Sequence, residues 1–414
     1  MSKSRPRVNQ RTEPRRDDPR ARFLIEMARA LGTYGMAAHR LEEAITLAGD
    51  ALGIRTQSIS LPTSVFLSIE IGEKRETMLS RVDPRGTDLS KIVALDEILR
   101  RVVERKVRPA RATRMIKRVV ARKPAYPALM HILAFAVAAT GVARFFGGGW
   151  REMVAAAITG LGVGALAHAA SRKRHFARLL EFAAGGTAAV LASLVALGVG
   201  PVSIRLVTMA GLIVLMPGMT ITTAMAELAT RNLVSGTARL VGAITVLLSI
   251  GLGMAVGERI AGHLPGGLDG LPVPLPVWTE VVAACVAPLG FVVLLNARAR
   301  DAMIMVPAGA GGFGLARILT AEIGTELGAC ATAAAIGIMG NIYQRKKNRP
   351  ASTVIFPGLL MLVPGTLGYR SFEFFLVEDT ITGTQTAFRV LVTALALVAG
   401  LLLANVAAAP KRSL

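Results

Sequence analysis

Long uncharged apolar runs dominate the chain from residue 128 onward. An α-helix needs about 20 residues to cross the hydrocarbon core of a bilayer, and each run meets or nearly meets that length. The ten runs cover residues 128–146, 152–170, 179–199, 203–227, 238–258, 275–296, 302–319, 325–343, 353–376 and 386–407. Because a soluble domain of this size could not bury so many runs, the sequence predicts a polytopic α-helical membrane protein with ten transmembrane helices.

Small and aliphatic residues supply most of the apolar content. Hydrophobic residues make up 52% of the chain but aromatic residues only 5%, and 42 residues are glycine. Small residues allow membrane helices to approach each other closely. Cys285 and Cys330 both fall inside predicted spans, so we expect small core residues there rather than a disulfide framework.

The distribution of positive charge predicts the orientation in the membrane. The loops after even-numbered spans and the C-terminus hold fourteen cations: Arg172, Lys173, Arg174, Arg178, Arg231, Arg239, Arg298, Arg300, Arg345, Lys346, Lys347, Arg349, Lys411 and Arg412. The loops after odd-numbered spans hold four, namely Arg144, Arg151, Arg205 and Arg259. Since basic loops stay in the cytoplasm, we expect a multi-pass protein of the plasma (inner) membrane with both termini cytoplasmic. A net charge of +21 is explained in this way without nucleic acid as a partner.

The residues before the first run predict a separate cytoplasmic unit. Residues 1–22, with three prolines among polar residues, predict a disordered basic tail. Residues 23–104 predict a small α+β domain, since a helical period over 23–52 precedes three short β-type runs. Those runs cover residues 57–61, 65–71 and 77–82. Asp88 or Ser90 is placed to cap a further helix that extends to Val103.

A basic segment joins this domain to the first span. Between Arg105 and Lys123 there are nine Lys and Arg and no acid, with Met115, Ile116, Val119 and Val120 interleaved. Residues 105–127 therefore predict a basic juxtamembrane helix. It lies either against anionic lipid headgroups or in solvent as a connector.

One short motif occurs twice, 147 residues apart. Leu215-Met216-Pro217-Gly218 lies in the fourth run, and Leu362-Val363-Pro364-Gly365 lies in the ninth. The same shift carries the starts of the other runs onto one another to within about three residues. The chain thus divides into two five-helix repeats, residues 128–260 and 275–407. An odd number of spans per repeat inverts the second repeat, and inverted repeats are typical of secondary transporters.

The Pro-Gly pairs predict broken helices and a substrate site near the bilayer midplane. Proline removes an amide donor and glycine lets the backbone leave helical geometry. A half-helix that begins after Gly218 or Gly365 would direct its positive end at a bound carboxylate. The predicted substrate-binding residues are Pro217, Gly218, Thr220, Thr222, Thr223, Pro364, Gly365, Thr366, Tyr369 and Arg370. The alternative is a simple kink whose threonines bond to their own helix.

Two acids near the breaks are candidates for carrying a coupling proton. Glu227 and Glu373 stand ten and nine residues after their prolines. An embedded carboxylate is costly unless it faces a cavity or a partner. The alternative is that each acid lies near a span end and reaches water.

Several segments resemble the threonine/serine exporter family over nearly all of residues 21–407. ALGTYGMAAHRLEEAITLAGDALGI resembles the opening helix of the family, with Gly35, Arg40 and Glu42 at its landmarks. LIVLMPGMTITTAMAELATRNLVSGTARL resembles its break motif, with Pro217, Gly218, Glu227, Gly236 and Arg239. LNARARDAMIMVPAGAGGFG and IFPGLLMLVPGTLGYRSF resemble later segments, which some members encode as a separate smaller subunit.

The resemblance implies a fused two-half exporter. We expect no cofactor. The exporter's substrates would be small hydroxy amino acids, threonine or serine, or in some members a dicarboxylate, and export would be driven by protons. The family pattern often has Asp at the position of Glu227, which leaves the role of this residue open. The implied partners are the substrate, protons and membrane lipids, and a homo-oligomer is left open.

A membrane-anchored hydrolase and a passive channel are the alternatives to a transporter. A membrane-anchored hydrolase would draw on the polar residues of the cytoplasmic domain, which are His39, Ser58, Ser60, Thr63, Ser64 and Asp83. None of them sits in a nucleophile-elbow pattern, and the segment from His39 to Glu42 lacks the second histidine of a zinc motif. We therefore predict neither an enzyme nor a metal site. A passive channel would require neither inverted halves nor embedded carboxylates.

Overall fold

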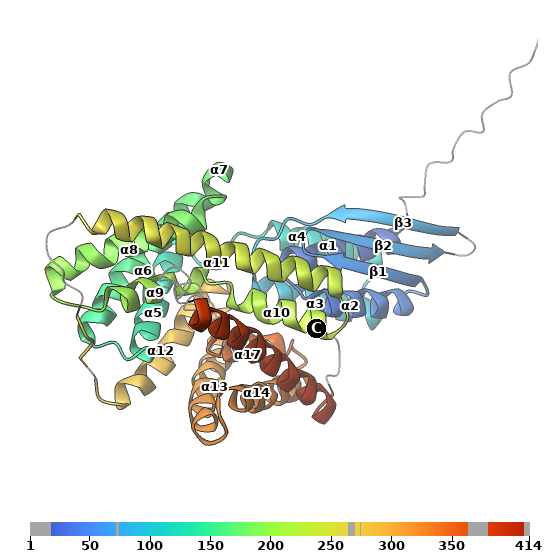
Figure 1. Cartoon of the computed structure of the whole chain (residues 1–414). Helices are drawn as coiled ribbons and strands as arrows, with labels where there is room; N and C mark the ends of the chain where they lie inside the picture. Colours follow the sequence, from blue (N-terminus) through green and yellow to red (C-terminus); the bar gives the residue numbers. More distant parts are fainter. Residues whose placement is uncertain (1–17, 72–73, 264–269, 274, 363–379, 410–414) are drawn as a thin grey trace, which may run out of the picture.

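A computed structural model describes residues 18–71, 74–263, 270–273, 275–362 and 380–409. An N-terminal domain of four helices and a three-stranded sheet lies at one end of the molecule, and a body of apolar helices forms the rest (Figure 1). The predicted architecture, a largely helical chain with a small α+β unit at its N-terminus, is therefore confirmed.

The N-terminal domain packs its helices on one face of an antiparallel sheet with strand order β1-β2-β3 (Figure 1). Its elements are α1 (Pro19–Thr33), α2 (Ala38–Ala51), β1 (Arg55–Leu61), β2 (Ser64–Ile71), β3 (Lys74–Arg81), α3 (Leu89–Val103) and α4 (Pro109–Ala121). The three predicted strands are confirmed. The Asp88 side chain accepts from the Lys91 backbone N–H at 3.0 Å, so the predicted cap of α3 is confirmed as Asp88.

Two boundaries in this domain differ from the prediction. The period over residues 23–52 is two helices, because the chain turns between α1 and α2 at Gly35, where φ is +80°. Glycine adopts this left-handed conformation without a steric penalty. Asp18 caps α1 through the Arg20 backbone N–H, so residues 19–22 are helical and not part of a disordered tail. Residues 1–17 lie outside the described residues.

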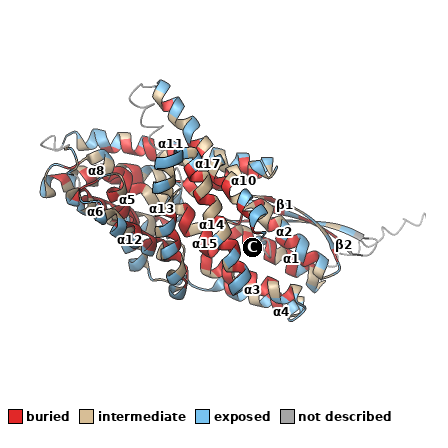
Figure 2. Ribbon diagram, turned by 90° about the horizontal axis from the view of Figure 1, so that it is seen from below, coloured by how far each residue is buried: buried red, intermediate tan, exposed pale blue. Residues whose placement is uncertain are grey.

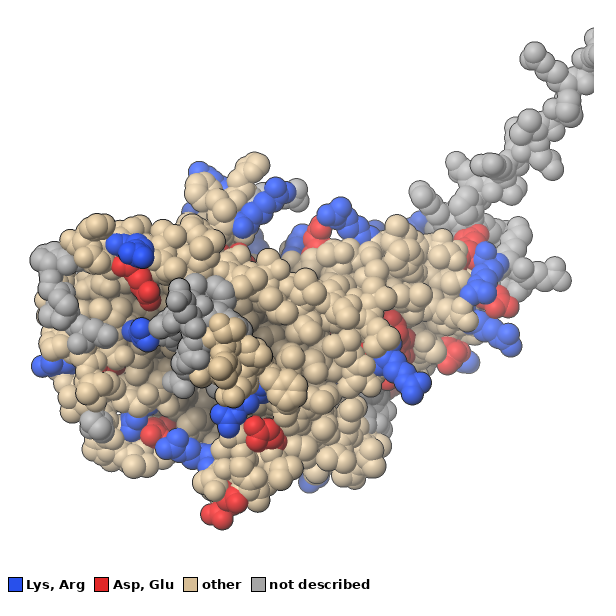
Figure 3. All heavy atoms as spheres, in the orientation of Figure 1, with Lys and Arg blue, Asp and Glu red and all other residues tan. Residues whose placement is uncertain are grey.

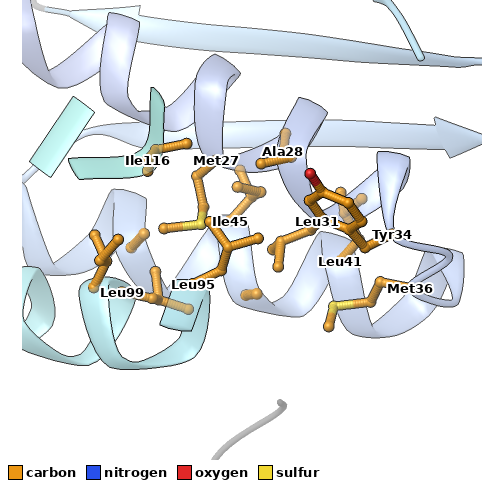
Figure 4. Packing of buried hydrophobic residues seen from close by; sticks show 14 of the residues in the cluster. Met27, Ala28, Leu31, Tyr34, Met36, Leu41, Ile45, Leu95, Leu99 and Ile116 are labelled. Carbon is orange, nitrogen blue, oxygen red and sulfur yellow. The ribbon is translucent and has the colours of Figure 1, made fainter. Parts of the chain in front are cut away.

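The basic helix α4 belongs to the N-terminal domain. Its apolar residues Ala112, Ile116 and Val119 are buried in the same core as Met27 of α1 and Leu95 of α3 (Figure 4). Residues 105–127 were predicted to form a helix that lies either against lipid headgroups or in solvent as a connector. Both placements are wrong for α4. The apolar face of α4 is covered by α1 and α3, and only its basic face is exposed.

The remaining helices form the apolar body. They are α5 (Ala128–Phe145), α6 (Trp150–Ser171), α7 (Arg174–Ala177), α8 (Leu180–Val199), α9 (Ile204–Leu212), η1 (Ile213–Leu215), α10 (Gly218–Ala229), α11 (Leu233–Ala261), α12 (Trp278–Leu294), η2 (Ala299–Asp301), α13 (Ala302–Ile323), α14 (Thr325–Lys347), α15 (Ser352–Leu360) and α17 (Thr380–Ala407). Buried positions cluster on the inner faces of α5 and α8, where most are Ala or Gly (Figure 2). Outward positions of α11 such as Val241 and Leu252 are exposed, and the surface over this helix carries few charges (Figure 3).

Six of the described helices are long and apolar enough to cross a membrane, and the count is seven if the bent pair α9–α10 is one span. The predicted count of ten is not reached within the described ranges. Helix α12 has only 17 residues, and the predicted ninth run continues into residues 363–376, outside those ranges. Ten spans and an inverted repeat therefore stay predictions.

The N-terminal domain is docked directly onto the body. Val292, Ala297 and Met305, from the region of α12 and α13, belong to the main hydrophobic core of the domain. The Leu89 backbone N–H at the start of α3 donates to the Leu295 carbonyl at 2.8 Å. Apolar packing and a backbone hydrogen bond thus fix the domain against the second half of the chain.

Candidate functional site

The first predicted helix break is present. Helix α9 with its continuation η1 meets α10 at an angle of 54°. Met216 is extended between them, and Pro217 offers no backbone N–H to continue the hydrogen-bond ladder. The second motif and its neighbours lie outside the described residues. These are Pro364, Gly365, Thr366, Tyr369, Arg370 and Glu373.

A cavity of about 110 Å³ lies beside α10. Its walls come from α10, from α15 and α17 of the second half, and from the turn between α1 and α2 of the N-terminal domain. The lining residues include Gly35, Met36, His39, Arg40, Met219, Thr222, Thr223, Ala226, Ser352, Phe356, Leu359, Leu401 and Asn405. This volume suits a few water molecules or a small solute.

The structure places only part of the predicted site at this cavity. Thr222 and Thr223 line it, whereas Pro217, Gly218 and Thr220 do not. The hydroxyl of Thr222 donates to the Gly218 carbonyl at 3.2 Å, as the simple-kink alternative expects. Thr223 therefore offers the hydroxyl from α10 that is better placed to meet a solute.

Ser352 of α15 supplies a second hydroxyl that the sequence reasoning missed. It is 6% exposed, and its Oγ has no hydrogen-bond partner among the described residues. A buried hydroxyl without a partner costs free energy. A solute in the cavity could remove that cost by bonding to Ser352.

Two basic side chains reach the cavity from the N-terminal domain. Burial, with a contribution from Arg40, lowers the pKa of His39 to about 4, so its ring is neutral at physiological pH. Burial also lowers the pKa of Arg40, and Glu43 partly opposes this. No described residue forms a hydrogen bond or salt bridge with the Arg40 guanidinium. A guanidinium at an apolar cavity is suited to a carboxylate.

Glu227 joins α10 to the N-terminal domain. Its side chain is 0% exposed, so the alternative that it lies near a span end and reaches water is wrong. Arg239 of α11 donates to its two carboxylate oxygens at 2.9 and 3.0 Å. The Ala38 backbone N–H, in the first turn of α2, donates to Glu227 Oε1 at 2.8 Å. Arg239 also donates to the Met36 carbonyl at 3.4 Å.

This contact supplies a cap that α2 lacks in its own sequence. Ala37 at the N-cap position has no side chain to accept a hydrogen bond. A carboxylate at a helix N-terminus satisfies an unpaired amide and interacts favourably with the helix dipole. The buried Glu227–Arg239 pair therefore holds the turn that forms one wall of the cavity.

Comparison with known families decides the identity of the chain. The ThrE family model matches residues 22–261, and a second model, described as "Threonine/Serine exporter, ThrE", matches residues 280–407. The chain belongs to the threonine/serine exporter family. The two models divide the chain near the boundary between the two predicted repeats.

Curated relatives of this exporter-family chain include fungal proteins named "Pheromone-regulated membrane protein 10". The protein of Eremothecium gossypii is 29% identical over 368 residues, which cover 85% of this chain and 49% of that protein. The Saccharomyces cerevisiae protein is 26% identical over 85% of this chain and 47% of its own length. The chain thus spans about half the length of these relatives. No solved structure matches the chain.

The polar residues weighed for a hydrolase are not assembled into a catalytic group within the described part of this ThrE-family chain. Ser58 and Ser60 lie on β1, and the Ser60 backbone N–H donates to Glu42 at 2.8 Å. No hydrogen bond joins His39 to a serine or threonine hydroxyl there. The described part of the chain also contains no group of three or more His, Cys, Asp or Glu side chains that could hold a metal. Membership of an exporter family favours transport over catalysis.

Acidification is expected to destabilise the protein through His39. The pKa of the folded state, about 4, lies below the value of about 6.5 in an unfolded chain. The unfolded state therefore binds the proton first, and stability falls as the pH falls from about 6.5 to about 4, by at most about 3 kcal/mol. Thermal unfolding of the full chain across this range should show a weaker pH dependence for His39→Gln than for the wild type.

The prediction concerns the difference in pH dependence between His39→Gln and the wild type. Glu42 and Glu43 also contribute to the pH dependence of stability, with the opposite sign to His39. Burial raises the pKa of both carboxyls, so their contribution to stability is lost as the pH rises. The matched control is His263→Gln, at an exposed histidine. Identical pH profiles for His39→Gln and the wild type would contradict the prediction.

Proposed function

We propose that the chain is a secondary transporter that exports small hydroxy amino acids, threonine or serine, from the cytoplasm with proton coupling. The observation that carries this proposal is the cavity beside the broken helix, lined by an Arg40 guanidinium that forms no hydrogen bond or salt bridge with any described residue. Arg40 would bind the substrate carboxylate, and Thr223 and Ser352 would meet its hydroxyl group. Membership of the threonine/serine exporter family supports the same substrate class.

The spacing of close helix contacts supports two related halves. A Cβ added to Gly253 would lie 1.9 Å from the Phe182 carbonyl oxygen, where α11 crosses α8. A Cβ added to Gly400 would lie 2.1 Å from the Cys330 carbonyl oxygen, where α17 crosses α14. The two glycines are 147 residues apart, the separation of the Pro-Gly motifs. This agreement favours ten spans in two inverted repeats around one site.

We propose that Glu227 couples protonation to the position of the turn between α1 and α2. Its carboxylate holds Arg239 and the Ala38 amide, and so it holds the turn that forms the cytoplasmic wall of the cavity. Protonation of Glu227 would remove the negative charge that both donors face and would favour release of the turn. Glu373 remains the proposed second proton carrier, outside the described residues.

Counterflow in proteoliposomes tests the substrate. Proteoliposomes that contain the purified full chain are preloaded with unlabelled threonine, serine or a dicarboxylate such as succinate. Uptake of each labelled compound is then measured. Exchange of threonine and serine, with uphill export that collapses when a protonophore is added, is the expected result. Exchange of dicarboxylates alone would select the related alternative, a dicarboxylate exporter. The absence of exchange for every compound would refute transport of these substrates.

Replacing Ser352 by alanine should separate stability from transport. Removal of a buried hydroxyl without a partner is expected to raise stability by about 1 kcal/mol, whereas loss of a substrate contact should raise KM severalfold. Apparent melting temperature and concentration-dependent counterflow measure the two effects.

The adjacent Thr353 provides the control. Its Oγ1 also lacks a partner among the described residues, but Thr353 does not line the cavity. Thr353→Val should therefore share the gain in stability and keep the wild-type KM. An unchanged KM in Ser352→Ala would remove this residue from the proposed site.

A further inference from the structure

A basic groove of about 670 Å³ lies between the N-terminal domain and the loops of the second half. Its walls come from α3 and α4, from the α12–α13 connection, and from the α14–α15 connection. The cations lining it are Arg100, Arg101, Arg118, Arg122, Arg298, Arg300, Lys347 and Arg349, against two acids, Asp96 and Glu97. The groove is separate from the cavity beside α10, since the two have no lining residue in common.

Three of these cations are already paired. Arg100 and Arg101 of α3 both contact Glu97, at 2.5 and 2.7 Å. Arg349 contacts the buried Asp301 at 2.8 Å. These pairs fix the walls of the groove but leave its charge unbalanced.

The side chains of the other five cations form no hydrogen bond or salt bridge with any described residue. They are Arg118, Arg122, Arg298, Arg300 and Lys347. They come from three separate segments of the chain, so the fold brings them together. Burial and the charges of Arg300, Arg349 and Arg122 lower the pKa of Arg298, although Asp301 opposes this. Like charges held this close repel one another, and a multiply charged anion between them would offset the repulsion.

We infer that this groove binds a phosphate group, carried by the headgroup of an anionic phospholipid or by a soluble phosphate compound. Arginine offers a planar set of donors that matches phosphate oxygens. The groove lies at the ends of α12, α13, α14 and α15, where apolar helices give way to basic loops, which is the level of lipid headgroups. A bound phosphate would bridge α4 of the N-terminal domain to the α12–α13 connection and stabilise the docked position of the domain.

A charge-matched pair of variants tests the site in the full chain. Arg122→Gln, Arg298→Gln and Arg300→Gln together remove three unpaired groove cations. Arg85→Gln, Arg111→Gln and Arg114→Gln together remove three exposed cations of the N-terminal domain that do not line the groove. Thermal unfolding in phosphatidylcholine-containing micelles is followed as short-chain phosphatidylglycerol, or inorganic phosphate, is added at constant ionic strength.

The wild type and the control variant are expected to show a saturable rise in melting temperature. The groove variant should need at least about tenfold more ligand for the same rise. Because it lacks the repulsion among the groove cations, its melting temperature without ligand should equal or exceed that of the wild type, which shows that it folds.

The two ligands distinguish the source of the phosphate. A rise with phosphatidylglycerol but not with inorganic phosphate assigns the site to a lipid headgroup, and an equal rise with both assigns it to the phosphate group alone. No saturable rise in the wild type, or the same midpoint for the groove variant and the wild type, overturns the inference.

Discussion

Replacing Glu227 by alanine is expected to destabilise the folded protein by about 3 kcal/mol, since removal of one partner leaves the other buried charge uncompensated. The Arg239 side chain is 17% exposed and the Glu227 side chain 0%, so water can satisfy Arg239 only in part. The same change removes the acceptor of the Ala38 amide and with it the cap of α2. Apparent melting temperature and limited proteolysis near the turn between α1 and α2 measure the two consequences.

A double-mutant cycle separates charge burial from general damage. The Glu227→Ala, Arg239→Ala double variant leaves no buried charge and should be more stable than the worse of the two single variants. Asp83→Ala is the control, because Asp83 pairs with Arg81 at 3.6 Å and the two side chains are 74% and 86% exposed. An exposed pair of this kind contributes less than about 1 kcal/mol. If Glu227→Ala melts like Asp83→Ala, then the buried pair does not hold the domain.

Loss of the contact should also change transport. With the α1–α2 turn released, Glu227→Ala is expected to exchange substrate without dependence on a proton gradient. Glu227→Gln keeps an oxygen for the Ala38 amide but carries no charge, so it should be intermediate in stability and should also lose proton dependence. Proton-dependent export in either variant would remove Glu227 from the coupling mechanism.

Local signals predicted the local features of this fold. The strands, the Asp88 cap and the bend at Pro217 each depend on residues within a few positions of one another. Proline and glycine alter the backbone through their own covalent structure. The break between α9 and α10 could therefore be predicted from the motif Leu215-Met216-Pro217-Gly218 alone. The turn at Gly35 carried the same kind of signal, but the helical period on both sides of it concealed the interruption.

The walls of the cavity could not be predicted in this way. Ala38 and Glu227 are 189 residues apart, and no periodicity links a helix start in one domain to a carboxylate in another. The prediction therefore named Glu227 as a candidate proton carrier without identifying its partners. It left His39 to the hydrolase alternative and gave Arg40 only as a landmark of the family's opening helix. Ser352 gave no signal at all, because an unpartnered hydroxyl becomes visible only when its surroundings are known.

The prediction for α4 failed for a related reason. A basic amphipathic segment next to a membrane span is typical of a helix that lies on headgroups. Charge and periodicity show that Ile116 and Val119 share a face, but they do not show what covers that face. Here α1 and α3 cover it.

Adding a single methyl group at Gly253 or at Gly400 is expected to be among the most damaging changes in the apolar body. The added Cβ would lie 1.9 Å from the Phe182 carbonyl oxygen in one case and 2.1 Å from the Cys330 carbonyl oxygen in the other. Backbone oxygens cannot rotate away as a flexible side chain can, so the paired helices must separate. Overpacking of this kind costs about 1–3 kcal/mol or more, and the apparent melting temperature of each purified alanine variant should fall accordingly.

The same helix supplies the control for Gly253. Gly242 also lies on α11, and a Cβ added there meets no atom within 4 Å. Gly242→Ala should be neutral or stabilising by up to about 1 kcal/mol, because alanine is the better helix former. Since Gly253 and Gly400 are 147 residues apart, equal losses at both would also support equivalent α8–α11 and α14–α17 pairs. Gly253→Ala and Gly242→Ala with the same melting temperature would show that α8 and α11 do not pack through this glycine.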